Sequence, residues 1–261
     1  MKFSKNFPKN LVYGPLHSRR VGYELGINPL HRSNKWCPFN CPYCQDGATK
    51  YQSLHIPESC PLPTVEEICA ALEEKLQGRK NGAQALNGIS ICGNGEPTLH
   101  PNFPKLVDEV IKIRDKFCPE VRIGVFSTGA TLENSAIFQA LLKLDSRYIK
   151  LDAGCEETFR AINAASQEIS FSQIVAAVET LSLAAPTTIQ TMFVRGLVDN
   201  SGSEEIDRWM RKLQTIQPVE VHIYSIARKP VDNRVARVEM EELERIAQRA
   251  RLEYNLPVWA Y

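Results

Sequence analysis

The stretch Trp36-Cys37-Pro38-Phe39-Asn40-Cys41-Pro42-Tyr43-Cys44-Gln45 carries three of the eight cysteines of the chain. Three residues separate the first two of these cysteines, and two residues separate the second from the third. Thiolates are soft ligands that select zinc, copper(I) or iron–sulfur clusters. Because the stretch supplies only three of them, one position of the metal centre is left for another ligand.

A small zinc site is the main alternative for this triplet. A structural zinc ion takes four ligands, usually supplied as two close pairs. His31 and His55 flank the triplet and Cys60 follows it, so each of them could provide a fourth ligand. A single triplet does not match the paired spacing of zinc sites, and we therefore favour an iron–sulfur cluster.

Composition excludes several classes of protein. The 261 residues are 43% hydrophobic and 23% charged, which is ordinary for a globular protein. The formal net charge of +1 shows none of the basic excess typical of a protein that binds a polyanion. Residues 1–10 are polar and no apolar run follows them, so we expect neither a signal peptide nor a membrane segment. We expect a cytoplasmic protein, in which cysteines bind metal or are buried as thiols.

Strand and helix patterns alternate along the chain. Thr64 and Glu67 form a capping box at the start of one helical pattern, which Gly78 ends. Six strands are expected, at 24–28, 89–92, 121–126, 148–151, 188–194 and 219–224. Six main helices are expected, at 64–78, 103–117, 132–144, 170–185, 203–216 and 239–252, with a short helical turn at 156–162. A lead-in at 1–20, an irregular loop at about 29–63 and an apolar tail complete the chain.

This alternation predicts the fold class. It is typical of an α/β protein with a parallel sheet and right-handed crossovers. Six repeats are too few for a closed eight-fold barrel. We therefore expect a partial (β/α)6 barrel, a parallel sheet with outer helices, in a single domain spanning 1–261; a doubly wound sheet is the alternative.

The predicted site lies at the carboxyl ends of the strands, where ligands bind in such sheets. The cysteine loop follows the first expected strand. The loops after the other five strands carry glycine, hydroxyl or charged residues, at 93–97, 127–129, 152, 195 and 225–228. We therefore expect six loops to converge on one face.

The cysteine spacing, with the aromatic residue Tyr43 before the last cysteine, resembles the signature of the radical S-adenosylmethionine (radical SAM) superfamily. The resemblance implies that Cys37, Cys41 and Cys44 hold a [4Fe–4S] cluster. It implies that the fourth iron chelates the amino and carboxylate groups of S-adenosylmethionine. It further implies reductive cleavage of this cofactor to methionine and a 5′-deoxyadenosyl radical, which abstracts a hydrogen atom from a substrate. The partial barrel of the superfamily agrees with the element count.

The loop Asn94-Gly95-Glu96-Pro97 resembles the Gly-Gly-Glu-Pro element of the superfamily. The resemblance implies that this loop and Tyr43 belong to the cofactor-binding site, with the loop near the methionine amino group. Asn94 replaces the first glycine of the element. An ordinary turn is the alternative, because Gly-Asn-Gly is a common turn sequence.

Three more residues follow expected strands. The resemblance implies contacts of Thr128 and Asp152 with the ribose or carboxylate of the cofactor, and the alternative for each is a cap on the next helix. Arg195 could pair with the methionine carboxylate, or lie in solvent. The remaining cysteines are expected to be small buried thiols, namely Cys60, Cys69, Cys92, Cys118 and Cys155.

A narrower likeness covers nearly the whole chain. Segments such as Tyr13-Gly14-Pro15, Ser18-Arg19-Arg20 and Ile162-Asn163 resemble the wybutosine-synthesis-related branch of the superfamily. A related enzyme of that pathway condenses pyruvate with a methylated guanine of tRNA. This chain lacks upstream cysteines for an additional cluster and has no basic excess. Arg19 and Arg20 could contact an anionic substrate or cap a hairpin.

The expected function is therefore a radical SAM enzyme of open substrate. Modification of a tRNA base is one candidate reaction, and a peptide or a small metabolite is the alternative substrate. A non-catalytic metal-binding adaptor is the alternative function. We expect an electron donor such as flavodoxin or ferredoxin, no membrane partner, and a monomer.

Overall fold

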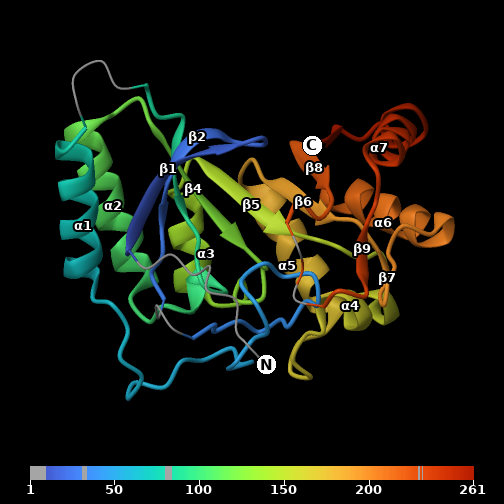
Figure 1. The fold of residues 1–261 in the computed structure, drawn as a ribbon, viewed down its shortest axis with the longest axis horizontal. Helices are drawn as coiled ribbons and strands as arrows, with labels where there is room; N and C mark the ends of the chain where they lie inside the picture. The colour runs from blue at the N-terminus through green and yellow to red at the C-terminus, as the bar shows by residue number, and fades with distance from the viewer. Residues whose placement is uncertain (1–9, 31–33, 80–83, 229, 231) are drawn as a thin grey trace.

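The computed structural model describes residues 10–30, 34–79, 84–228, 230 and 232–261. Its main sheet has eight strands in the order β1-β2-β3-β4-β5-β6-β8-β10 (Figure 1). These strands are β1 (Val12–Ser18), β2 (Gly22–Ile27), β3 (Gly88–Ile91), β4 (Arg122–Ser127), β5 (Ser146–Lys150), β6 (Thr188–Met192), β8 (Glu220–Tyr224) and β10 (Val258–Ala260). Each neighbouring pair is parallel except β1 and β2.

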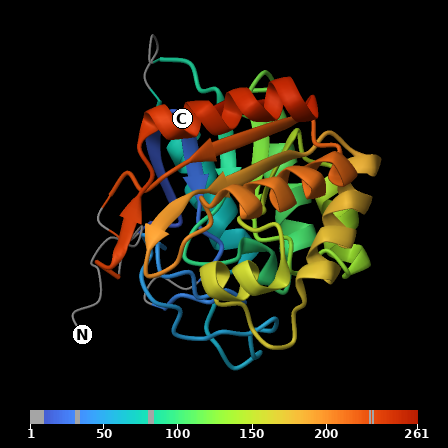
Figure 2. The ribbon, with the colours of Figure 1, turned by 90° about the vertical axis from the view of Figure 1, so that its right-hand side faces the viewer.

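The helices follow the strands in the expected alternation. They are α1 (Val65–Gln77), α2 (Phe103–Phe117), α3 (Ser135–Leu142), α4 (Glu156–Asn163), α5 (Phe171–Ala184), α6 (Ser203–Ile216) and α7 (Met240–Tyr254), with a 3-10 turn η1 (Pro97–Leu99). Helices α1 and α2, α2 and α3, α5 and α6, and α6 and α7 pack side by side. They lie along the outer side of the sheet (Figures 1 and 2). The prediction of an α/β fold with a partial barrel and outer helices is confirmed.

Local sequence explains why these elements form. The capping box predicted at Thr64 and Glu67 is present at the start of α1. The apolar face of α1 is buried, and all five residues of β6, which lies between β5 and β8, are buried. None of the helices in the described ranges combines the length and hydropathy of a membrane span.

Four expectations about the elements were wrong. The expected lead-in contains strand β1, in which Gly14 and Pro15 interrupt the alternation of apolar and polar residues. Residues 1–9 of the lead-in lie outside the described ranges. The apolar tail contains β10, which is too short to show a period. The expected strand at 188–194 ends at Met192, and β7 (Val194–Gly196) pairs separately with β9 (Val235–Arg237). Helix α3 begins late because Asn134 caps it.

An irregular segment joins β2 to α1 and carries the cysteine triplet. It crosses the carboxyl edge of the sheet, where Trp36 forms single β-bridges with Tyr51 and Gly95. The indole of Trp36 stacks on the ring of Tyr51, with centroids 4.2 Å apart. The cysteine segment is therefore attached to the loop that follows β3.

Candidate active site

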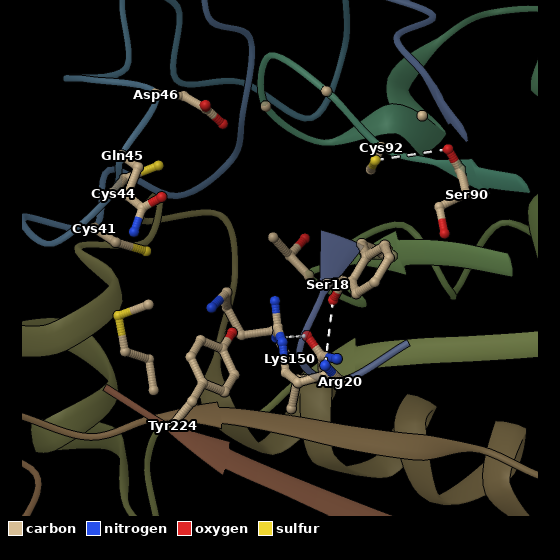
Figure 3. Close-up of a pocket in the computed structure, with 18 of the residues that line it drawn as sticks. Ser18, Arg20, Cys41, Cys44, Gln45, Asp46, Ser90, Cys92, Lys150 and Tyr224 are labelled. Atoms are coloured by element: carbon tan, nitrogen blue, oxygen red, sulfur yellow. Dashed lines mark hydrogen bonds between the residues drawn. The ribbon is translucent and has the colours of Figure 1, made fainter. Parts of the chain in front are cut away.

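A cavity of about 600 Å³ opens at the carboxyl ends of the strands (Figure 3). The β1–β2 hairpin, the cysteine segment and the ends of the central strands form its wall. Seven of the predicted site residues line this one cavity, namely Cys37, Cys41, Tyr43, Cys44, Gly95, Glu96 and Thr128. Four of the six expected loops converge on this cavity, namely the cysteine loop and those at 93–97, 127–129 and 225–228, whereas Asp152 and Arg195 do not line it.

Backbone hydrogen bonds hold the cysteine segment against the loop after β3. The Trp36 amide donates to the Asn94 carbonyl at 3.3 Å, and the Glu96 amide donates to the Trp36 carbonyl at 2.9 Å. Gly95 between them has φ +118°, and a Cβ there would lie 1.7 Å from the Trp36 carbonyl oxygen. Only glycine fits this position. The close contact with Trp36 therefore explains the glycine of the Gly-Glu-Pro sequence.

The three thiols of the triplet are free and share one wall of the cavity. Cys37 and Cys41 are buried and Cys44 is half-buried. In the described part of the chain, no three His, Cys, Asp or Glu side chains are already gathered as ligands of one metal ion. A cubane does not require that, since each cysteine binds a different iron of the cluster. The three thiols, which line one cavity, could therefore hold a cubane together.

The alternative of a zinc site finds less support. The side chain of Cys60 packs beside Leu30, Trp36 and Leu99, and His55 is exposed; neither lines the cavity. His31 lies outside the described residues. No fourth ligand for a single ion thus faces the described cavity wall from these positions.

Lys35 places a buried positive charge beside the triplet. Its ammonium donates to the Gly47 carbonyl at 3.0 Å. Burial alone would lower the pKa of Lys35, but the thiols of the triplet outweigh burial and raise that pKa overall. A cation at this position favours the thiolate form that an iron–sulfur cluster requires.

Glu96 connects the loop after β3 to the end of β4. One carboxylate oxygen accepts from the Thr98 amide at 3.2 Å, the Thr98 hydroxyl at 2.6 Å and the Ser127 hydroxyl at 2.9 Å. The other accepts from the Thr128 amide at 2.6 Å and the Thr128 hydroxyl at 2.7 Å. Thr128 therefore does not cap α3, which Asn134 does. Glu96 orders two of the loops that surround the cavity.

Asp152 is the centre of a buried polar cluster behind Tyr43. Its carboxylate accepts from the Tyr43 hydroxyl, from the Asn163 amide at 2.7 Å and from the Lys150 ammonium at 3.2 Å. Its second oxygen accepts from the Met192 amide at 2.8 Å. Asp152 neither lines the cavity nor caps α4, which begins after Cys155. Its carboxylate fixes the ring of Tyr43 in the cavity wall.

The other predicted residues are placed as follows. Asn94 and Pro97 are buried in the wall behind Gly95 and do not face the cavity. Arg195 lies on β7 and does not line the cavity. Its guanidinium forms an ion pair with Glu242, at 2.5 Å. The ligand roles assigned to Asn94, Pro97 and Asp152 stay predictions.

The β1–β2 hairpin supplies a fixed arginine. Arg20 donates to the Gln190 side chain at 2.5 Å, and its guanidinium lies 4.0 Å from the ring centroid of Tyr224. Arg20 lines the cavity, while Arg19 beside it is exposed at the rim. An arginine that lies over a ring keeps N–H groups that can bind an anion.

Sequence reasoning missed three residues of this site. Lys35 precedes the triplet, and Lys150 is the last residue of β5, whose sequence SRYIK alternates buried and half-buried residues and gave no signal of a site. Asn163 donates to the Cys41 sulfur at 3.5 Å as well as to Asp152. It comes from the end of α4, so only the fold brings it to the triplet.

Comparisons with known proteins agree with this geometry. Residues 33–209 match the model of the Radical SAM superfamily. The chain is 29% identical over 215 residues to a UPF0026 protein of Synechocystis sp., covering 81% of this chain and 74% of that protein. It is 27% identical over 236 residues to the protein named GTPase Obg of Brachyspira hyodysenteriae, covering 90% of this chain and 32% of that protein. The chain thus spans about a third of the length of that relative.

Solved structures show the same fold. A radical SAM methyltransferase from Sphaerobacter thermophilus aligns with a TM-score of 0.69 at 14% identity, covering 91% of this chain and 65% of that one. TYW1 with a lysine–pyruvate adduct bound aligns with a TM-score of 0.62 at 18% identity, covering 87% of this chain and 72% of that one. From the match of its sequence to the family model and the site that its fold assembles, the chain belongs to the radical SAM superfamily.

Proposed function

We propose that the protein is a radical SAM enzyme that cleaves S-adenosylmethionine reductively and removes a hydrogen atom from a substrate. A [4Fe–4S] cluster on Cys37, Cys41 and Cys44, with S-adenosylmethionine, would supply the one-electron chemistry when bound. The observation that carries the proposal is the sharing of one cavity by the three thiols, Gly95 and Glu96.

The residues of the chain have separable tasks in this proposal. Trp36 and Gly95 join the cysteine segment to the loop that follows β3. Glu96 holds that loop against the end of β4, and Asp152 holds Tyr43 in the wall. Such fixed walls exclude water from reactive species. The cavity volume of about 600 Å³ lies in the range of small-molecule sites.

For the substrate, we propose a molecule with an anionic group, with a tRNA base as the first candidate. Arg20 within the cavity and Arg19 and Arg228 on its wall support an anion. The resemblance of the sequence to the wybutosine-synthesis-related branch supports a base of tRNA. A peptide or a small metabolite is the alternative. We expect a flavodoxin- or ferredoxin-type protein to supply electrons.

Anaerobic reconstitution with iron and sulfide tests this proposal. The wild-type protein should bind about four irons per chain and release 5′-deoxyadenosine when dithionite and S-adenosylmethionine are added. Cys44→Ala should lose this product, whereas Cys69→Ala, which removes a thiol of helix α1 outside the cavity, should retain it. Colourless wild-type protein with one bound zinc and no 5′-deoxyadenosine would contradict the proposal and favour the non-catalytic adaptor.

A further inference from the structure

One thiol outside the cysteine triplet also faces the cavity. Cys92 directly follows β3 and lies across the cavity from Cys41 and Cys44 (Figure 3). Its sulfur is 3.0 Å from the Tyr13 hydroxyl oxygen, and Tyr13 lines the same cavity. The described wall therefore carries a thiol–phenol pair that cluster binding leaves unused. We had expected Cys92 to be a plain buried thiol.

The fold provides space for this contact. Tyr13 on β1 and Gly26 on β2 are partners in the sheet register. A Cβ at position 26 would lie 2.2 Å from the Cζ atom of Tyr13, so only glycine leaves room for the ring. Strand β2 separates β1 from β3. The phenol ring thus crosses over β2 to reach Cys92, and the glycine in between makes this crossing possible.

Both groups of the pair keep their protons near neutral pH. Burial, assisted by Glu24 and Asp46, raises the pKa of Cys92 to about 12. Burial, assisted by Cys92, raises the pKa of Tyr13 above its ordinary value. A protonated thiol is a poor nucleophile and metal ligand. It is a good hydrogen-atom donor to carbon radicals, because an S–H bond is weaker than an alkyl C–H bond.

We propose that Cys92 donates a hydrogen atom to the substrate radical and that Tyr13 restores the thiol. This inference rests on the proposed function. The Sγ–H bond of Cys92 breaks and a C–H bond of the product forms, which leaves the unpaired electron on sulfur. The Tyr13 O–H bond then breaks and the S–H bond forms again. The resulting tyrosyl radical takes one electron from a flavodoxin- or ferredoxin-type donor and one proton from water.

The test uses the reconstituted full chain with S-adenosylmethionine and dithionite in D₂O, without added substrate. The hydrogen that completes 5′-deoxyadenosine must then come from the protein. Thiol and phenol hydrogens exchange with solvent, whereas hydrogens bound to carbon do not. We expect wild-type protein to yield 5′-deoxyadenosine with one deuterium by mass spectrometry, and a tyrosyl signal by electron paramagnetic resonance after freeze-quenching.

Two variants separate the members of the pair. Cys92→Ser keeps the size of the side chain and its hydrogen bond but removes the weak S–H bond, so deuterium and the tyrosyl signal should both be lost. Tyr13→Phe should keep the deuterium and lose the tyrosyl signal. Cys69→Ala is the matched control and should behave as wild type. Iron content and circular dichroism show that each variant is folded and carries its cluster.

The outcomes distinguish this inference from the proposed function. A wild-type protein that releases no 5′-deoxyadenosine overturns the proposed function and the inference with it. Release of unlabelled 5′-deoxyadenosine by wild type, or unchanged labelling in Cys92→Ser, overturns only the role of Cys92. Loss of deuterium in Cys92→Ser with the same yield of 5′-deoxyadenosine supports it.

Discussion

Replacement of Glu96 by glutamine should destabilise the protein even without a cluster or cofactor. The two carboxylate oxygens accept five hydrogen bonds from Thr98, Ser127 and Thr128. Glutamine has one accepting oxygen, and its NH₂ group would face donors at the other position. If the glutamine oxygen faces Thr98 and Ser127, its NH₂ group faces Thr128. The Thr128 hydroxyl can then rotate and accept a hydrogen bond from this NH₂ group. The Thr128 backbone N–H can only donate, so it loses its acceptor.

The expected cost follows from that count. A buried N–H group left without an acceptor costs about 1–3 kcal/mol, and hydrogen bonds to a charged acceptor contribute about 1 kcal/mol more than those to a neutral one. We therefore expect Glu96→Gln to lower the free energy of unfolding by about 3 kcal/mol.

The assay is equilibrium urea unfolding of the protein without metal, followed by circular dichroism. Glu66→Gln is the matched control, because Glu66 forms a surface ion pair with Lys105 and its side chain is 70% exposed. That variant should unfold at the urea concentration of wild type. A change below about 0.5 kcal/mol in Glu96→Gln would refute the assignment of Glu96 as the link between the two loops.

Three further predictions follow from other parts of the wall. Gly95→Ala should prevent the cysteine segment from docking at Trp36, because the new Cβ overlaps a carbonyl oxygen; low iron content after reconstitution checks this, and wild-type loading would contradict it. Asp152→Asn should lower the free energy of unfolding by about 3 kcal/mol by leaving the Lys150 ammonium unpaired, and an unchanged urea midpoint would contradict it. Burial lowers the pKa of His100 in the folded protein. As pH falls below about 6.5, the histidine therefore binds a proton in the unfolded chain before it does so in the folded one, and the free energy of unfolding declines. His100→Gln should make that decline shallower in urea unfolding measured at several pH values, whereas an equally steep decline would exclude this histidine as a contributor.

The alternation of the central strands with helices could be predicted because most of these elements have a clear local period, which β1 and β10 lack. The neighbourhood of the cysteine triplet and the Gly95–Glu96 turn was predictable for the same reason, since both follow adjacent parallel strands. What local patterns cannot show is which side chains meet within the wall. Tyr13 and Cys92 are 79 positions apart, and their contact depends on an intervening glycine of a third segment.

Two placements differ from the simplest expectation for physical reasons. Asp152 lies two residues beyond the end of β5, but three side-chain donors and a backbone amide occupy its carboxylate. Arg195 follows its expected strand, but a separate two-stranded ribbon carries it toward Glu242. A position after a strand places a residue at the carboxyl edge of the sheet. Packing then decides which of these side chains face the cavity.

The central claim is that the triplet holds a cluster with one iron open to S-adenosylmethionine. Electron paramagnetic resonance of the reconstituted, reduced protein tests it most directly. We expect the spectrum of a reduced [4Fe–4S] cluster that changes when S-adenosylmethionine is added, with both features lost in Cys41→Ala. A cluster spectrum that S-adenosylmethionine leaves unchanged, or no cluster spectrum at all, would contradict the account.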